Sequence, residues 1–233
     1  MLVLFDLDGT LLDTRGCGRW AMMRAFEDVF GIPDAELFVR DVPFEGATDR
    51  ALLKAIGRNA SIDESAIAAS GGDLEAAFVR RLEERLAATS GMRSLPGVDE
   101  LLDRLAGVHS SAMGLATGNM RRGAFLKLTS VGLGGHFDLG GFGDDSESRT
   151  TIGRIARERF EERLGAPINA GNVVLVGDSV ADVESARANG YRSLAVRTGW
   201  AGPGTLEAAR PDCLMDDLSD FAAVMQFVFG TRG

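Results

Sequence analysis

The most constraining feature of the sequence is a short apolar run that ends in a pair of carboxylates. Residues 2–5 read Leu-Val-Leu-Phe, and the sequence DLDGT follows at residues 6–10. A continuous apolar run of this length is typical of a parallel strand that is buried on both faces. Ligands of open parallel sheets bind beyond the carboxyl ends of the strands, so both aspartates are predicted to lie where a ligand would bind.

The same pattern recurs along the chain. Further apolar runs occupy residues 112–116, 173–176, 194–196 and 213–215. Helical periodicity separates them, with Thr150 expected to cap a helix that begins near residue 151 and Gly190 expected to end another. Strands that alternate with helices predict an α/β fold with a doubly wound, Rossmann-like parallel sheet.

Residues 15–93 break this alternation and show helical periodicity alone. Large apolar side chains share a helix face in two stretches, namely Trp20, Met23, Phe26 and Phe30, and then Leu74, Phe78, Leu82 and Leu86. We expect both stripes to pack in a core. The sequence thus predicts an α/β core domain from residues 1–14 and 94–233, with residues 15–93 inserted as a helical cap domain.

Composition excludes several classes of protein. The net charge of −9 and a sequence pI of about 4.8 disfavour binding to nucleic acid or to an anionic membrane. The two cysteines, Cys17 and Cys213, lack metal-type spacing and are expected to be free thiols in a reducing compartment. With no secretion signal or membrane-spanning run expected, the predicted location is cytoplasmic.

Two strand ends carry paired acids. Asp178 and Asp182 follow the run at residues 173–176, and they would join Asp6 and Asp8 at one edge of the sheet. An Asp or Ser that caps the next helix would explain one of these later acids but not both. Like charges 4 Å apart repel by about 1 kcal/mol in water and about 4 kcal/mol at an effective dielectric constant near 20. With no His or Cys nearby, the oxygen ligands favour Mg²⁺ over zinc.

Taken together, these motifs resemble the haloacid dehalogenase-like hydrolase superfamily, and in particular its phosphatases with a helical cap. Residues 6–13 are similar to the first motif of that family, residues 117–119 to the second and residues 177–182 to the fourth. The general layout is similar to that of phosphoglycolate phosphatases. The resemblance implies an enzyme that uses Mg²⁺ to hydrolyse a small phosphorylated metabolite.

The resemblance also implies residue roles. Asp6 would attack phosphorus and form an aspartyl-phosphate, while Asp8 would protonate the leaving oxygen and later deprotonate the hydrolytic water. Mg²⁺ would be held by Asp6, by the main-chain carbonyl of Asp8 and by Asp178, with Asp182 as an auxiliary ligand.

Phosphate binding is expected from Thr117, Gly118, Asn119 and a cation of the third motif. The family usually has a lysine there, but the chain has only Lys54 and Lys127. Lys127 falls inside the helix predicted after the second motif, whereas Arg149 has the better spacing. We assign the role to Arg149, with Lys127 as the alternative.

Other readings within the superfamily stay open. Dehalogenase relatives lack a carboxylate at the position of Asp8, so that activity is not expected. Mutases often use a cap histidine, and His109 and His136 both lie outside the predicted cap. Hydrolysis is therefore favoured over the alternatives, a sugar-phosphate mutase or a non-catalytic protein that binds a phosphorylated ligand.

Substrate specificity is expected in the predicted cap. Thr48, Asp49 and Arg50 are candidates, although Thr48 could equally cap the following helix. Both a monomer and a homodimer fit the sequence, and it does not identify the substrate.

Overall fold

The main sheet is parallel, and both acidic motifs follow the ends of its strands. The computed structural model describes residues 1–230. In this range six strands pair in the order β5 (Gly140–Gly141), β4 (Ala112–Ala116), β1 (Leu2–Phe5), β6 (Val173–Gly177), β7 (Arg192–Val196) and β8 (Cys213–Met215). Every neighbouring pair is parallel. The predicted α/β fold with a doubly wound parallel sheet is confirmed.

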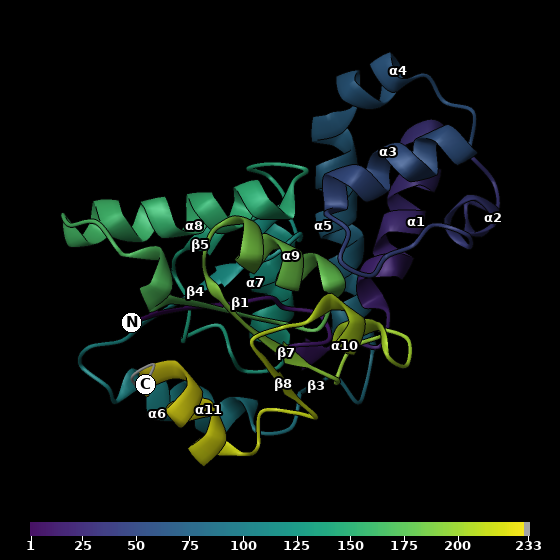
Figure 1. The fold of residues 1–233 in the computed structure, drawn as a ribbon. Helices are drawn as coiled ribbons and strands as arrows, with labels where there is room; N and C mark the ends of the chain where they lie inside the picture. The colour runs from purple at the N-terminus through teal and green to yellow at the C-terminus, as the bar shows by residue number, and fades with distance from the viewer. Residues whose placement is uncertain (231–233) are drawn as a thin grey trace.

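Helices cover both faces of this sheet (Figure 1). Leu2 and Leu4 face the helices α8 (Arg149–Leu164) and α9 (Val180–Ala188). Val3 and Phe5 point to the opposite face, as alternation along a strand requires. That face is covered by α6 (Val98–Ala106), α7 (Arg121–Ser130) and α11 (Phe221–Phe229). The short helices η1 (Ala170–Asn172) and α10 (Thr205–Ala209) complete this part of the molecule.

Five helices are inserted between β1 and α6 and lie to one side of the sheet (Figure 1). We call them the inserted helices. They are α1 (Cys17–Phe30), α2 (Glu36–Val39), α3 (Asp49–Asn59), α4 (Glu64–Ala69) and α5 (Gly71–Ala88). Their buried side chains form a hydrophobic cluster of their own, to which Met120 of the core also belongs. The antiparallel ribbon of β2 (Leu12–Asp13) and β3 (Arg93–Ser94) joins the points where the chain leaves and re-enters the core.

One local prediction, the cap of α8, was wrong, and the predicted stripe on α1 holds in part, with Phe26 buried and Trp20, Met23 and Phe30 partly buried against the same cluster. Ser148, not Thr150, caps α8, because Ser148 has an extended backbone and its hydroxyl accepts from the Thr151 amide. The buried face of α1 is centred on Ala21, Met22, Ala25 and Phe26. Trp20 lies at the edge of that face, where the guanidinium groups of Arg24 and Arg85 cover its ring. The stripe from Leu74 to Leu86 on α5 is buried as predicted.

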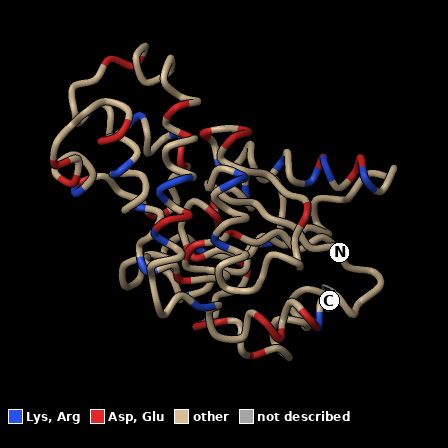
Figure 2. The backbone as a smooth tube through the Cα atoms, turned by 180° about the vertical axis from the view of Figure 1, so that it is seen from behind, with Lys and Arg blue, Asp and Glu red and all other residues tan. Residues whose placement is uncertain are grey.

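Charge is distributed evenly over most of the chain. Figure 2 shows acidic and basic residues interleaved along the backbone of residues 1–230. Within the same residues, no helix combines the length and the apolar composition that crossing a bilayer requires.

Gly97 provides a test of the packing between α6 and the segment that precedes α11. It caps α6 with a φ of 82°, and a Cβ on it would lie 2.3 Å from the main-chain carbon of Leu218. Gly132 has a similar φ of 84° but nothing within 4 Å of the same position. Gly132→Ala should therefore cost about 1–2 kcal/mol of unfolding free energy from the left-handed backbone alone.

Gly97→Ala should cost about 1–3 kcal/mol more, because the backbone of Leu218 must also move. Urea denaturation of the two variants and the wild-type protein measures the difference. Equal destabilisation by both substitutions would contradict the close approach at Gly97.

Candidate active site

Three strand ends meet at one edge of the sheet. β1 lies between β4 and β6 in register, with Phe5 opposite Leu115 on one side and Val176 on the other. The residues that follow these strands, Asp6, Thr117 and Asp178, therefore come together although they are far apart in the sequence. Asp6 is tied to the neighbouring strand, since its amide donates to the Val176 carbonyl at 2.9 Å.

Three buried carboxylates form a cluster at this edge. Asp6, Asp178 and Asp182 each offer an oxygen within 4.8 Å of the others. Burial, followed by the charges of Asp6 and Asp182, raises the pKa of Asp178 well above its ordinary value. Burial also raises the pKa of Asp6, although Arg149 opposes the shift. Without a cation, these carboxylates can lie so close together only if some of them are protonated. Their oxygen atoms are the donors that a hard divalent ion prefers.

The glycine and threonine of the DLDGT sequence support this cluster. Gly9 has a φ of 83°, and a Cβ there would lie 2.5 Å from Oδ2 of Asp178. The hydroxyl of Thr10 donates to Oδ1 of the same carboxylate at 3.1 Å. The turn after β1 thus brings its backbone against Asp178 and donates to it, which explains why these residue types follow Asp8.

Asp182 has a structural role beside its place in the cluster. It forms a capping box with Ser179 at the start of α9, in which the Ser179 hydroxyl donates to Oδ2 of Asp182 at 2.6 Å. Its other oxygen, Oδ1, accepts from Arg149. Helix capping therefore explains the presence of Asp182, but it does not explain the presence of Asp178.

Arg149 lies in the site, as the first residue of α8. Its Nη1 donates to Oδ1 of Asp6 at 3.1 Å, and its Nη2 pairs with Asp182. Burial tends to lower the pKa of this guanidinium, but Asp182 and Asp6 outweigh burial and raise it. Arg149 thus brings positive charge directly beside Asp6, where a phosphoryl group would be expected.

The carboxylate of Asp8 is held by side chains that do not belong to the acidic cluster. Its Oδ2 accepts from Lys127 Nζ at 2.5 Å and from Asn119 Nδ2 at 2.9 Å, and Thr14 donates to Oδ1 at 3.5 Å. The expected contribution of Asp8 to metal binding therefore depends on its main-chain carbonyl.

Lys127 was the predicted alternative to Arg149 for the cation of the third motif. The two cations contact different aspartates, so they do not compete for one position. The sequence analysis did not foresee the contact of Lys127 with Asp8. The sequence feature that could have indicated this contact is the spacing of Lys127 from Ala124 and Leu128, which places all three on the buried face of α7.

The residues of the second motif form a tight turn after β4. Thr117 is fully buried, and its amide donates to the Gly141 carbonyl of β5. Its hydroxyl oxygen accepts from the amide and the side chain of Asn119 at 3.3 and 3.0 Å. Gly118 has no room for a side chain, since a Cβ would lie 2.4 Å from the Ala47 carbonyl oxygen.

The inserted helices contact the core at this turn through Asp49. The Asp49 amide donates to the Gly118 carbonyl at 2.8 Å, and its carboxylate accepts from the Met120 amide at 2.7 Å. The Thr48 side chain caps α3 by accepting a hydrogen bond from the Ala51 amide, as the alternative interpretation of Thr48 predicted. Arg50 is exposed, and so differs from its two predicted companions, which are buried.

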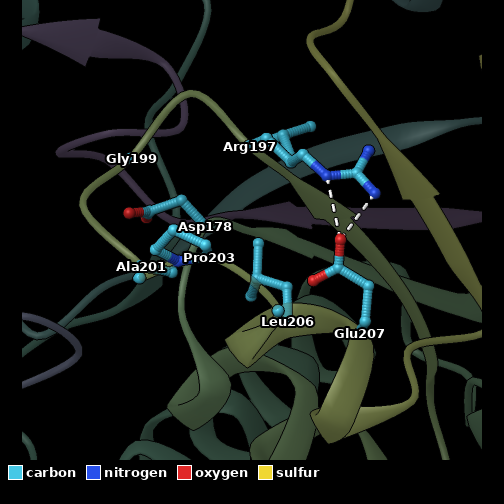
Figure 3. Close-up of a pocket in the computed structure, with 10 residues that line it drawn as sticks. Asp178, Arg197, Gly199, Ala201, Pro203, Leu206 and Glu207 are labelled. Carbon is cyan, nitrogen blue, oxygen red and sulfur yellow. Dashed lines mark hydrogen bonds and ion pairs between the residues drawn. The ribbon is translucent and has the colours of Figure 1, made fainter.

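A cavity of about 360 Å³ adjoins Asp178. Figure 3 shows Asp178 at one end of it and the ion pair of Arg197 with Glu207, at 2.8 Å, at the other. Its remaining lining runs from Val196 at the end of β7 to Leu206 in α10. Of the acidic cluster, Asp178 lines this cavity, whereas Asp6 and Asp182 do not.

Comparison with known proteins identifies the family. A model of the haloacid dehalogenase-like hydrolases matches residues 3–196. The chain belongs to the haloacid dehalogenase-like hydrolase family. The resemblance predicted from the sequence motifs is confirmed, as is the prediction of an enzyme of this hydrolase family.

Relatives in this family match nearly the whole chain. The probable phosphatase IndB of Dickeya dadantii is 29% identical over 94% of this chain and 90% of its own length. The N-acetylmuramic acid 6-phosphate phosphatase of Pseudomonas aeruginosa is 29% identical over 86% and 83%. A structure described as a predicted phosphoglycolate phosphatase from Haemophilus somnus has a TM-score of 0.70 and covers 97% of both chains. At 19% identity, that structure shows the shared fold alone.

The buried carboxylate of Asp49 gives a prediction about pH and stability. Burial raises its pKa from 3.8 to about 6, although Lys127 opposes the shift. Between these values the folded protein binds a proton that the unfolded chain has released, so the contribution of Asp49 to stability falls as the pH rises from about 4 to about 6.

Asp49→Asn should remove this contribution. Relative to the variant, the wild type should lose up to about 3 kcal/mol of unfolding free energy between pH 4 and pH 7. Chemical denaturation at both pH values measures the change. A difference between the two proteins that is the same at both pH values would contradict the prediction.

The acidic cluster gives a second prediction, about metal binding. Because the pKa values of Asp6 and Asp178 are raised, an ion must displace protons from them at low pH. The rise in melting temperature on addition of Mg²⁺ should therefore be larger at pH 8 than at pH 5.

Asp178→Asn should abolish most of that rise, and K⁺ at equal ionic strength controls for screening. Thermal unfolding followed by circular dichroism measures both. A rise that is independent of pH, or that survives in Asp178→Asn, would show that Mg²⁺ binds elsewhere.

Proposed function

We propose that the protein is a Mg²⁺-dependent phosphatase that hydrolyses a small phosphomonoester through an aspartyl-phosphate on Asp6. The observation that carries the proposal is the contact of Arg149 with Asp6 at 3.1 Å, at the point where the ends of β1, β4 and β6 meet. A nucleophilic carboxylate and a cation that can bind phosphoryl oxygens share one buried position there.

Asp6 acts as the nucleophile in this proposal. The guanidinium of Arg149 favours the ionised form of its carboxylate, which is the form that can attack phosphorus. As the substrate arrives, the same guanidinium can donate to two oxygens of the phosphoryl group. Thr117, Gly118 and Asn119 lie at the adjacent strand end, where the Thr117 hydroxyl and the Gly118 amide would donate to the remaining oxygens.

Asp8 acts as the acid and base. It protonates the leaving oxygen during attack by Asp6, and it then takes a proton from the water that hydrolyses the aspartyl-phosphate. Asp8 lies two residues after Asp6 in the sequence, and Gly9 turns the chain directly after Asp8.

Mg²⁺ would be held by Asp6, by the main-chain carbonyl of Asp8 and by Asp178, with Asp182 as an auxiliary ligand. When bound, the ion would supply positive charge that offsets the charges of the carboxylates and of the phosphoryl oxygens. Asp182 is the weakest of these ligands, since both of its oxygens already accept hydrogen bonds from Ser179 and Arg149.

The inserted helices act as the cap in this proposal, over residues 15–93. Asp49 fastens them to the turn of residues 118–120, and Lys54 pairs with Glu147 of the core at 2.6 Å. Opening of these contacts would admit substrate, and their closure would exclude water from the site. Thr48 and Asp49 lie at this contact and remain the candidates for substrate selection, with exposed Arg50 beside them.

The relatives support the substrate class. Both relatives described above are named as phosphatases, and one of them is named for N-acetylmuramic acid 6-phosphate. A small phosphorylated metabolite is therefore the proposed partner, in a cytoplasmic protein. Neither glycolate phosphate nor a sugar phosphate is singled out by the residues of the site.

A panel of phosphorylated metabolites tests the function. The panel contains phosphoglycolate, N-acetylmuramic acid 6-phosphate and several sugar phosphates, each with Mg²⁺ or with excess chelator. At least one ester should release inorganic phosphate with Mg²⁺ only. Asp6→Asn should abolish that release, because an amide is not a competent nucleophile. Asp103→Asn, an exposed substitution on α6, is the matched control.

Three outcomes would contradict the proposal. Isomerisation of a sugar phosphate without phosphate release would indicate a mutase. Binding of an ester without turnover would indicate a non-catalytic phospho-ligand protein. Full activity of Asp6→Asn would exclude Asp6 as the nucleophile.

A further inference from the structure

Lys127 is buried, and the burial of a lysine side chain requires an explanation. It is one of two lysines in the chain, and its side chain is 5% exposed. It lies on the face of α7 that also contains Ala124 and Leu128. Lysine is among the residues least often buried, because removing an ammonium group from water is costly unless it is paired.

The partners of Lys127 are two residues of the proposed catalytic machinery. Its Nζ donates to Oδ2 of Asp8 and to Oδ1 of Asn119, both at 2.5 Å. Asn119 closes the triangle, since its Nδ2 donates to the same Oδ2 of Asp8 at 2.9 Å. Lys127 therefore fixes the Asp8 side chain both directly and through Asn119.

These contacts treat the two oxygens of Asp8 differently. Oδ2 accepts two strong donors, whereas the Thr14 hydroxyl is 3.5 Å from Oδ1. A carboxyl proton cannot occupy an oxygen that faces an ammonium and an amide N–H. Oδ1 is thus the oxygen of Asp8 that can exchange a proton with a substrate.

The first turn of α1 limits where the ammonium can lie. A Cβ on Gly18 would lie 3.1 Å from Nζ of Lys127 and 3.4 Å from its Cε. The lysine is therefore enclosed between the core and the inserted helices. Its position is determined by packing as well as by its hydrogen bonds.

We propose that Lys127 is a positioning residue that presents Oδ1 of Asp8 to the leaving group. The inference rests on the proposed phosphatase function. In the first step Oδ1 gives its proton to the leaving oxygen, while the bond from that oxygen to phosphorus breaks and the Asp6–phosphorus bond forms. The ammonium then lies beside the negative charge that Asp8 has acquired and stabilises it. In the second step Oδ1 takes a proton from water as the water oxygen bonds to phosphorus and Asp6 is released.

Dependence on the leaving group tests this role. An alkyl phosphate has a poor leaving group and needs the proton from Asp8, whereas 4-nitrophenyl phosphate has a good leaving group and needs it far less. Lys127→Met should lower kcat/KM for the best alkyl ester of the metabolite panel by about 10²-fold or more. The loss on 4-nitrophenyl phosphate should be smaller by at least about tenfold.

Two further variants make the test specific. Arg154→Met removes a cation from the exposed ion pair with Glu158 on α8, and it should leave both substrates unaffected. Lys127→Gln keeps a donor without the charge, and it tests the same prediction if Lys127→Met fails to fold, as thermal unfolding would reveal. The selective loss should appear in Lys127→Gln as well, to a smaller extent.

The remaining outcomes overturn the inference. Equal losses on the two substrates would mean that Lys127 only supports the turn of residues 117–120. No loss on either substrate would mean that it does not position Asp8. In both cases the wild type would still release phosphate in an Asp6-dependent manner, so the proposed function would stand. A wild-type protein inactive on every ester would remove the proposed function and this inference together.

Discussion

The structure depends on the close burial of like charges at the carboxyl edge of its sheet. Asp6, Asp178 and Asp182 lie within reach of one ion, and Arg149 pairs with two of them. Their mutual repulsion grows as water is excluded, so this arrangement requires compensation from elsewhere in the fold. Part of it comes from hydrogen bonds: Thr10 donates to Asp178, and Ser179 donates to Asp182. The repulsion that these hydrogen bonds do not compensate is the physical basis for expecting a cation.

Local features of the sequence were enough to predict the elements that build this edge. β1, β4 and β6 are short apolar runs, and each ends in residues whose chemistry differs abruptly from that of the strand. Such runs are informative because a strand buried on both faces tolerates few polar residues. The edge strand β5 contains only Gly140 and Gly141 and offers no such signal. Its glycines are explained by crowding, since a Cβ on Gly141 would lie 2.2 Å from the Ile152 carbonyl oxygen.

Contacts between distant segments could not be predicted in the same way. Lys127 reaches Asp8 across 119 positions of sequence, and Asp49 reaches Met120 across 71. Neither contact follows from a motif, because each depends on how the inserted helices and α7 pack against the core. The helix of Lys127 was foreseen, but a lysine on a helix is more often exposed. The capping of α3 by Thr48 was within reach of local reasoning, whereas the burial of Asp49 beside it was not.

The turn of residues 118–120 connects these separate observations. Asp49 of the inserted helices contacts Gly118 and Met120, and the residue between them, Asn119, contacts both Asp8 and Lys127. Loss of the Asp49 contacts would free the segment that holds Asn119 against Asp8. The geometry of Asp8 described above therefore belongs to the form in which the inserted helices contact the core. In the proposed mechanism, the proton donor would be complete only when this contact is made, and admission of water would then be coupled to the position of Asp8.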